Sequence, residues 1–451
     1  MDYLIEYHSL LAAQIHNITA SIPSKNLYFL DCFLSRAINN DMYYRYALQH
    51  ERYHQLRTSG LSEHNAMSKI LTFIDKYTSL QPNILRTDII PQISISDTYK
   101  YAGLPIVIAL NYRQLDYLIP LLRRFKEEIL CLSLCNPHRT VINNSNLDNV
   151  VFIQYPYFNL KSYTSGFLSD YFPDVLRHAF TLDFIFNQLH PSTVINLEGC
   201  NTISQLSAII SSKYNIPSIC IQHGWPSFFH LGFQYLPYNY MLTWGDGFNP
   251  IWRSYNPTVN CISTGYMYNI TNELSSRSKI TFFLQGPYVI SSTEHLNSYI
   301  TAIKYIATKF PLQSICVREH PEFHLSDYVH QELSTYSNIE FVTNHNLMEV
   351  YGATKFAIAH FSSTIMESAI HGCIPIVFDP TYNSSYQPDL SVVGLGFMSK
   401  TIQELTNILS LHIPTFRLDQ QNISRNLHNW IYSVGDRSLD NITSFISALN
   451  H

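Results

Sequence analysis

The sequence lacks several features that would assign it at once to a common class of protein. No segment approaches the roughly 18 uninterrupted apolar residues of a membrane span. Only 14% of the residues are charged, the net charge is −5 and there is no basic run, so we expect no nucleic-acid partner. The first 17 residues contain acids and histidine but lack the basic and apolar regions of a signal peptide. We therefore expect a cytoplasmic location.

Patterns of cysteine and of metal ligands are missing as well. The eight cysteines are scattered, and Cys131 and Cys135 form a CxxxC without a second pair, so we expect reduced thiols. The 20 histidines show no HExxH or comparable spacing, and no Asp-x-Asp pair is present to hold a divalent ion on a diphosphate. The sequence therefore predicts no cofactor and no metal. The absence of GxGxxG, P-loop and GxSxG motifs removes support for dinucleotide oxidoreductases, NTPases and hydrolases of those classes.

Apolar strands that alternate with helices are the main positive signal. Up to about residue 80 the spacing is helical, with the best pieces at Tyr43–Leu48 and Ala66–Tyr77. Strands are then expected at Pro105–Leu110, Ile129–Leu134, Val150–Gln154, Val194–Leu197, Ser218–Gln222 and Tyr240–Thr243, and helices at Gln114–Lys126, Phe167–Leu189 and Ile203–Tyr214. After a polar linker at 271–279, strands are expected at Ile280–Leu284, Ser314–Val317, Ile339–Val342, Lys355–His360 and Ile374–Phe378, and helices at His295–Lys309, Asn346–Tyr351, Ile402–Leu411 and Ser438–Leu449.

Strands that are apolar throughout, separated by helices, are typical of parallel sheets covered on both faces. We therefore predict an α/β fold with two Rossmann-like, doubly wound domains that face a cleft. The expected divisions are a helical extension at 1–80, a first domain at 81–270, a second domain at 280–437 and a closing helix at 438–451.

A hydroxyl-rich helix start follows the strand Lys355–His360. Ser362, Ser363 and Thr364 lie where unpaired N–H groups and the positive end of the helix dipole meet, a place that suits a phosphate without a metal. Glu367, one turn further, can accept hydrogen bonds from the hydroxyls of a sugar. In the structural alternative, Thr364 and Glu367 form a capping box that stabilises the helix whether or not anything binds.

A second strand-end turn in the same domain contains Arg318, His320 and Pro321. Ligands of doubly wound sheets bind outside the carboxyl ends of the strands, which is where this turn is expected. The proline would hold the turn, and the imidazole could donate to a phosphate oxygen, which would raise its pKa. An ordinary surface or core histidine is the alternative.

The first domain has two strand-end turns of its own. Glu198 precedes a glycine after one strand, and partial burial there would raise its pKa toward that of a general base. The alternative is that Glu198 caps the next helix. His223 follows the next strand and can orient the acceptor, contact the donor or serve as the base instead. Trp225 is a candidate acceptor-stacking platform or an ordinary core residue.

These motifs, in this order, resemble bacterial GT-B fold glycosyltransferases that build surface polysaccharides, above all the His-Pro-motif group that includes bacterial sialyltransferases. In that group a His-Pro pair and a serine pair bind the nucleotide phosphate, matched here by His320–Pro321 and Ser362–Ser363. A carboxylate-glycine motif supplies the base. Leu197–Gly199 matches it in part, because the group usually has two acids before the glycine. The turn Gln222–Gly224 is similar to one in capsule-type Kdo and glycerophosphate transferases.

The resemblance implies a metal-independent glycosyltransferase. The first-choice donor is CMP-sialic acid or a related CMP-ulosonic acid, and a UDP-sugar, a GDP-sugar or CDP-glycerol is the alternative. The acceptor would be a hydroxyl of a lipid-linked glycan or oligosaccharide destined for O-antigen, capsule or lipooligosaccharide, with peripheral contact at the cytoplasmic face of the inner membrane. A sugar-nucleotide 2-epimerase and a non-catalytic GT-B-like scaffold are the remaining alternatives.

Overall fold

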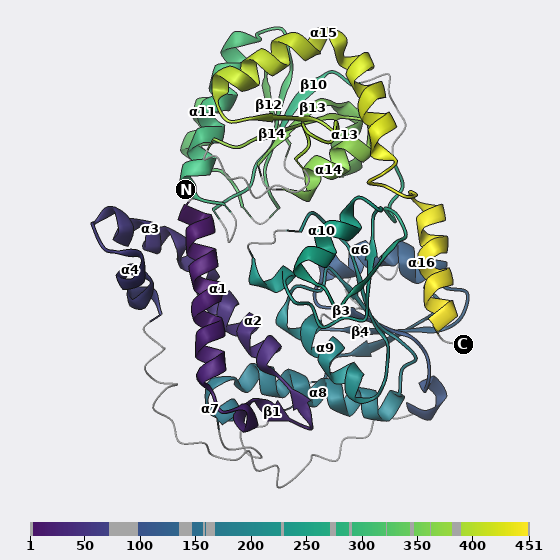
Figure 1. Cartoon of the computed structure of the whole chain (residues 1–451). Coiled ribbons are helices and arrows are strands. Elements are labelled where there is room, and N and C mark those ends of the chain that lie inside the picture. Colours follow the sequence, from purple (N-terminus) through teal and green to yellow (C-terminus); the bar gives the residue numbers. More distant parts are fainter. Residues whose placement is uncertain are drawn as a thin grey trace.

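Two separate parallel sheets organise the chain (Figure 1). The computed structural model describes residues 3–71, 98–134, 147–156, 158, 167–226, 230–270, 277–287, 291–321, 323–342, 347–360, 362–380 and 389–449. Within them, one sheet has seven strands and the other six, and each is flanked by helices. The predicted α/β fold with two Rossmann-like domains is confirmed. Among the described helices, none is both long and apolar enough to cross a membrane.

The seven-stranded sheet belongs to the first domain and has the order β5-β4-β3-β6-β7-β8-β9. Its strands are β3 (Ile106–Ala109), β4 (Ile129–Ser133), β5 (Val150–Gln154), β6 (Val194–Leu197), β7 (Ser218–Ile221), β8 (Tyr240–Thr243) and β9 (Asn260–Ser263). Its helical elements are η3 (Thr98–Tyr101), α6 (Tyr112–Arg124), α7 (Phe167–Tyr171), α8 (Pro173–Leu189), α9 (Thr202–Lys213), η6 (Leu231–Phe233) and α10 (Phe248–Tyr255). β9 and α10 were not expected. β9 is a partly exposed edge strand with polar ends, so it shows no apolar run.

Both faces of this sheet are covered, which explains why its strands are apolar throughout. Ile106 and Ile108 of β3 join the core under α8 and α9, whereas Val107 and Ala109 join the core under α6. Successive side chains of a strand point to opposite faces, so a strand buried on both sides needs an apolar residue at every position.

The six-stranded sheet of the second domain has the order β12-β11-β10-β13-β14-β15. Its strands are β10 (Lys279–Phe283), β11 (Ile315–Arg318), β12 (Ile339–Val342), β13 (Thr354–Ala359), β14 (Ile374–Phe378) and β15 (Phe397–Ser399). Its helices are α11 (Thr293–Lys309), α12 (Asp327–Ser334), α13 (Leu347–Ala353), α14 (Ser363–Ile370) and α15 (Ile402–Leu427). β15 and α12 were not expected. Most of the predicted linker, 271–276, lies outside the described residues.

Prolines account for two differences between expected and observed helices. The helix expected over Phe167–Leu189 is interrupted at Phe172, whose backbone leaves the helical region because Pro173 follows it and begins α8. The helix expected to end at Leu411 instead continues to Leu427 with Pro414 inside it. Figure 1 shows this helix, α15, passing over the second sheet and then turning down toward the first domain, as a proline-containing helix can.

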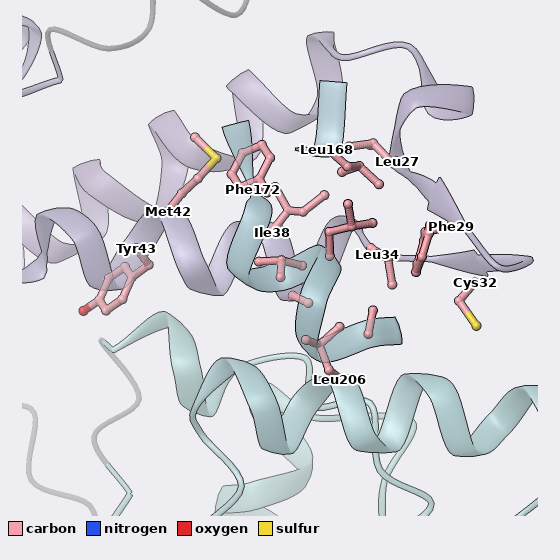
Figure 2. Close-up of a cluster of buried hydrophobic side chains, with 14 of the residues drawn as sticks. Leu27, Phe29, Cys32, Leu34, Ile38, Met42, Tyr43, Leu168, Phe172 and Leu206 are labelled. Carbon is pink, nitrogen blue, oxygen red and sulfur yellow. The ribbon is translucent and has the colours of Figure 1, made fainter. Parts of the chain in front are cut away.

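The N-terminal extension is mainly helical and packs on the first domain. It comprises α1 (Tyr3–Ser21), η1 (Ser24–Leu27), β1 (Tyr28–Phe29), β2 (Cys32–Phe33), α2 (Ser35–Tyr46), η2 (Ala47–Gln49), α3 (His50–Thr58) and α4 (Glu63–Ile70). Figure 2 shows Ile38 and Met42 of α2 facing Phe172 and Leu206 in one buried cluster. The small hairpin β1–β2 was not expected. Residues 72–77 of the helix predicted at Ala66–Tyr77 lie outside the described part of the chain.

Two connections join the extension and the C-terminus to the domains. The carboxylate of Glu51 in α3 accepts hydrogen bonds from the backbone N–H (2.8 Å) and hydroxyl (2.7 Å) of Thr293 at the start of α11. After α15 the chain crosses back to the first domain, where the final helix, α16 (Asp436–Leu449), lies on α6 (Figure 1). There the guanidinium of Arg124 donates to Asp440 at 2.7 Å. The extension therefore contacts the second domain as well as the first, whereas α16 packs on the first domain.

The seven cysteines within the described residues form no disulfide, and most of them are buried. This confirms the expectation of reduced cysteines for the described part of the chain. Cys135 lies outside it.

Candidate functional site

The predicted site residues lie near the points where each sheet reverses its strand order. In the first sheet the reversal lies between β3 and β6, and in the second between β10 and β13. Ligands of doubly wound sheets bind outside the carboxyl ends of the strands at such points. Glu198 directly follows β6, and Ser362 follows β13 at the start of α14. The fold therefore places one residue group from each domain where a ligand site is expected.

The start of α14 has the hydroxyl arrangement expected for an anion site, but its cap differs from the predicted one. Ser362 is the N-cap: its hydroxyl accepts from the N–H of Thr364 (3.3 Å) and donates to the Thr364 hydroxyl (2.9 Å). Because the helix begins at Ser363, Glu367 is too far along to cap it. The expected capping box of Thr364 and Glu367 is therefore wrong, and Glu367 is held by Tyr351, whose hydroxyl donates to it at 3.0 Å.

Glu367 is a buried carboxyl at the domain junction. Its side chain is 8% exposed, and burial raises its pKa to about 7. The hydrogen bond from Tyr351 and the positive charges of Arg113 and Arg318 oppose this rise. Arg113 belongs to the first domain, so charges from both domains act on this carboxyl. A group with a pKa near neutrality can exchange a proton with a ligand.

Glu319, which had no predicted role, holds the turn after β11. It is 3% exposed, and its carboxylate accepts three hydrogen bonds. The donors are the Leu325 N–H (2.7 Å), His330 Nε2 (2.9 Å) and His324 Nδ1 (3.1 Å). Burial alone would raise the pKa of Glu319, but these hydrogen bonds and the neighbouring histidines outweigh it and leave the pKa below its ordinary value.

The other residues of this turn are at the surface of the sheet's carboxyl edge. Arg318 ends β11 and is partly exposed, as is His320, whose carbonyl accepts from the Phe323 N–H at 3.0 Å. Pro321 is exposed, and Glu322 lies outside the described residues. β11 is two strands from β13 in the sheet, so His320 is not adjacent in strand order to the hydroxyls at the start of α14. Arg318 lies close enough to influence Glu367 electrostatically.

Glu198 occupies a tight turn after β6. Glu198 and Gly199 both have positive φ values, of 69° and 67°. A Cβ at Gly199 would lie 2.5 Å from the Cys220 sulfur, so only glycine fits there. Asn201 caps α9 by accepting from the Ser204 N–H at 2.9 Å, so the alternative that Glu198 is the cap of this helix is wrong.

The electrostatic surroundings shift the pKa values of Glu198 and His223 in opposite directions. Burial raises the pKa of the partly exposed Glu198 carboxyl, and the charge of Arg113 opposes the rise. Burial and, second, Arg113 lower the pKa of His223 to about 4. The imidazole packs against Tyr117, with ring centres 4.2 Å apart, and lies 3.5 Å from the Tyr268 hydroxyl. A base works best when its pKa approaches the working pH, which is the direction of the Glu198 shift.

Arg113, Tyr117 and Tyr268 lie among the candidate site residues and were missed by the sequence interpretation. Arg113 acts electrostatically on Glu198, His223 and Glu367, and its guanidinium lies over the Tyr117 ring, 5.7 Å from the ring centre. It is the second residue of α6, four residues after the end of β3, so the strand-end rule applied to the turn after this strand would have found it. Tyr268 follows β9, a strand that was not predicted.

Trp225 is placed in the core that the two domains share. Its side chain is 5% exposed and makes a perpendicular ring contact with Phe248, with centres 6.4 Å apart. Ile365 and Met366 of α14 belong to the same cluster. This placement favours the core alternative over a stacking platform for an acceptor.

A cavity of about 420 Å³ lies away from these residues, on the flank of the second domain. It is bounded by α11, the end of β14 and the start of α15, with Ser298, Phe378 and Thr401 among its lining residues. Its lining contains none of the predicted site residues, so it is not the candidate site.

Comparisons with known proteins support the fold assignment. No protein-family model matches the chain, and no curated protein sequence matches it. A solved UDP-GlcNAc 2-epimerase from Neisseria meningitidis, bound to UDP-GlcNAc, is 13% identical with a TM-score of 0.54, over 76% of this chain and 100% of that one. MnaA of S. aureus with UDP is 12% identical, with a TM-score of 0.52 over 76% and 96% of the two chains.

A solved transferase structure has a similar fold as well. The ugt transferase of Siraitia grosvenorii in complex with UDP is 10% identical, with a TM-score of 0.52 over 77% of this chain and 100% of that one. Likenesses at such low identity establish the fold. The chain has two Rossmann-like domains in the GT-B arrangement, as predicted.

Proposed function

We propose that the protein is a glycosyltransferase that binds a nucleotide sugar at the junction of its two domains. The observation that carries this proposal is that two unlike groups of residues lie at the reversal points of the two sheets, and that Arg113 acts electrostatically both on Glu198 and on Glu367 of α14. A hydroxyl-rich helix start, at Ser362 and Ser363, and the raised-pKa carboxyl Glu198 come from the reversal points of opposite sheets. One group suits a phosphate and the other suits proton removal from a hydroxyl.

In the proposed reaction, the leaving nucleotide phosphate lies at Ser362, Ser363 and Thr364, with Arg318 and His320 completing the positive end of the site. Negative charge that develops on the phosphate as the anomeric bond breaks is stabilised by the helix N-terminus and these donors. Glu198 accepts the proton of the acceptor hydroxyl as its oxygen forms the new glycosidic bond. No step of this scheme calls for a metal ion.

The proposed donor is a nucleotide sugar, with a CMP-ulosonic acid as first choice. The order of the carboxylate-glycine, His-Pro and serine-pair motifs supports this choice through the resemblance to the His-Pro-motif group. The likeness to proteins whose structures contain UDP or UDP-GlcNAc supports a UDP-sugar instead. The proposed acceptor is a lipid-linked glycan or oligosaccharide on the path to a surface polysaccharide.

A thermal-shift panel with CMP, CDP, UDP and GDP tests the proposal. A ligand present at 100 times its dissociation constant stabilises the folded state by about 2.7 kcal/mol. We expect one nucleotide to raise the melting temperature and Ser363→Ala to weaken that response. Ser334→Ala is the matched control, because this hydroxyl on α12 is exposed and donates to the His330 carbonyl of its own helix. A panel without any shift would instead support the non-catalytic scaffold.

A sugar-nucleotide 2-epimerase is the second candidate, favoured by one observation. Two carboxyls with raised pKa values, Glu198 and Glu367, come from opposite domains to the same junction. Such a pair could remove a proton from one side of a sugar carbon and return one to the other side. Incubation with UDP-GlcNAc and no acceptor, followed by NMR, decides between the candidates. Epimerised product supports the epimerase, and unchanged UDP-GlcNAc leaves the transferase as the better proposal.

A further inference from the structure

We propose that His295, His360 and Asp379 bind a divalent transition-metal ion of the zinc type inside the second domain. One ligand atom from each residue lies within 4.8 Å of the other two. All three side chains are buried, with exposed fractions of 1%, 3% and 1%. This inference is independent of the proposed function, because it concerns a cluster that the catalytic scheme does not use.

Three different elements bring these ligands together. His360 directly follows β13 and Asp379 directly follows β14, and the two strands are neighbours in the parallel sheet. His295 is the third residue of α11. Because the ligands are far apart in the sequence, they form no motif of the HExxH kind, which is why the sequence predicted no metal.

The distances suit a small ion. His360 Nε2 lies 3.4 Å from Asp379 Oδ1, and the rings of His295 and His360 have centres 4.1 Å apart. Zinc bonds of about 2.0–2.2 Å to nitrogen and oxygen place tetrahedral ligand atoms roughly 3.3–3.6 Å from one another. The ligand atoms of His360 and Asp379 therefore already have the required separation. Side-chain rotation would bring the ligand atom of His295 to the same distance from both.

Ser292 orients the third ligand. Its backbone N–H donates to His295 Nδ1 at 3.2 Å, and its hydroxyl lies 2.7 Å from Nδ1 and accepts a hydrogen bond from the His295 N–H at 3.2 Å. These contacts fix the position of the ring. Nδ1 accepts from the backbone, so the neutral ring carries its proton on Nε2, and a metal bound at Nε2 would displace that proton. Metal-binding histidines usually have a partner on their other ring nitrogen. The backbone of Asp379 is held as well, since its N–H donates to the Ser399 carbonyl at 2.8 Å.

The donor atoms define the class of metal. Two imidazole nitrogens and one carboxylate suit Zn²⁺, Co²⁺ or Fe²⁺, whereas Mg²⁺ and Ca²⁺ prefer sites made of oxygen. Burial of all three ligands indicates an ion that ties the start of α11 to the ends of β13 and β14. The fourth position would be filled by an internal water or by the second oxygen of Asp379. Three protein ligands with an open fourth position are also found in catalytic zinc sites, so the structural role follows from the burial of all three ligands and not from their number.

Metal content of the full-length protein tests this proposal. The chain is stripped with a chelator, incubated with Zn²⁺ or Co²⁺, desalted and analysed by elemental mass spectrometry and visible absorption. We expect about one ion per chain, a tetrahedral Co²⁺ spectrum and a raised melting temperature. Failure of the full chain to retain either ion would overturn the proposal and leave a buried His–Asp–His network.

Variants locate the ion and control for misfolding. Asp379→Asn and His295→Gln keep the side chain close to its original size and should each abolish stoichiometric binding and the Co²⁺ spectrum. His412→Gln is the matched control, because His412 and Asp419 form a two-residue pair, 2.9 Å apart, on α15. It should bind as the unmodified chain does. The assignment is wrong if either variant is folded by circular dichroism and still binds one ion. A single folded variant is therefore enough for the test.

Discussion

Gly224 and Ser363 meet across the junction of the two domains. A methyl group at Gly224 would lie 3.0 Å from the Ser363 Cβ and 3.4 Å from its hydroxyl oxygen. Gly224 directly follows His223 after β7, and Ser363 begins α14. The turn that carries His223 and the candidate phosphate site are therefore in direct contact, and a side chain at position 224 would fit only if Ser363 or this turn moved.

Gly224→Ala should impair function more than stability. The added methyl group must push the start of α14 or the β7 turn by a few tenths of an ångström, and Ser363 with it. Displacements of about 1 Å in a site can cost on the order of 100-fold in rate, so we expect a loss of roughly 10-fold or more in kcat/KM. Steady-state kinetics with the donor found in the nucleotide panel, alongside thermal unfolding, measures both effects.

Gly352→Ala is the control for this substitution. Gly352 lies within α13, and a Cβ there would meet nothing within 4 Å. Alanine is the better helix former, by about 1 kcal/mol, so this variant should be at least as stable as the unmodified chain and equally active. If Gly224→Ala is as active as Gly352→Ala, the contact with Ser363 does not constrain the site.

Ser363→Ala and His320→Ala test the phosphate site. Each removes a hydrogen-bond donor aimed at developing negative charge, which typically costs about 100-fold or more in turnover. The rates are measured at saturating donor, with circular dichroism to confirm the fold and Ser334→Ala as the control. Normal turnover in both folded variants would remove the phosphate-site assignment. If only Ser363→Ala lowers turnover, the phosphate site is limited to the start of α14.

Glu198→Gln and His223→Asn separate the two candidate bases. Because the pKa of Glu198 is raised and that of His223 is lowered to about 4, we expect Glu198→Gln to abolish transfer and His223→Asn to reduce it far less. Nucleotide binding, measured by thermal shift, should survive in both. Transfer that persists in Glu198→Gln and disappears in His223→Asn would reverse the assignment.

Most of the sheet architecture could be predicted because buried parallel strands have a strong and simple signature. β5, β6, β8, β12 and β14 lie where they were expected, to the residue. β9 and β15 were not predicted, because they are partly exposed edge strands without a continuous apolar run. The end of α15 was misplaced because a proline usually stops a helix, whereas Pro414 lies inside this one.

The candidate site was less predictable, because it depends on contacts between segments far apart in the chain. Glu198 and Ser363 could be found from the strand ends that precede them. The role of Glu319 in holding the turn after β11 could not be found from the sequence. It depends on three hydrogen-bond donors that come together only when the turn is folded. The contact between Gly224 and Ser363 depends on how the two domains meet, which no local pattern encodes.

Glu367→Gln should change how stability depends on pH. The unfolded carboxyl loses its proton near pH 4.5, whereas burial in the folded state raises the pKa to about 7. Between these values the folded state binds more protons than the unfolded state, so this group makes stability fall as pH rises, and the fall ends above about pH 7. A pKa shift of this size changes the free energy of unfolding by roughly 3 kcal/mol at most.

Denaturant unfolding across this pH range measures the effect. The free energy of unfolding of the unmodified chain, minus that of Glu367→Gln, should fall from about pH 4.5 to about pH 7 and then level off. Other titrating groups cancel in this difference. A flat curve for Glu367→Gln would mean that this carboxyl is hydrated in solution, and Glu367 would then lose its place as a proton-exchanging group at the domain junction.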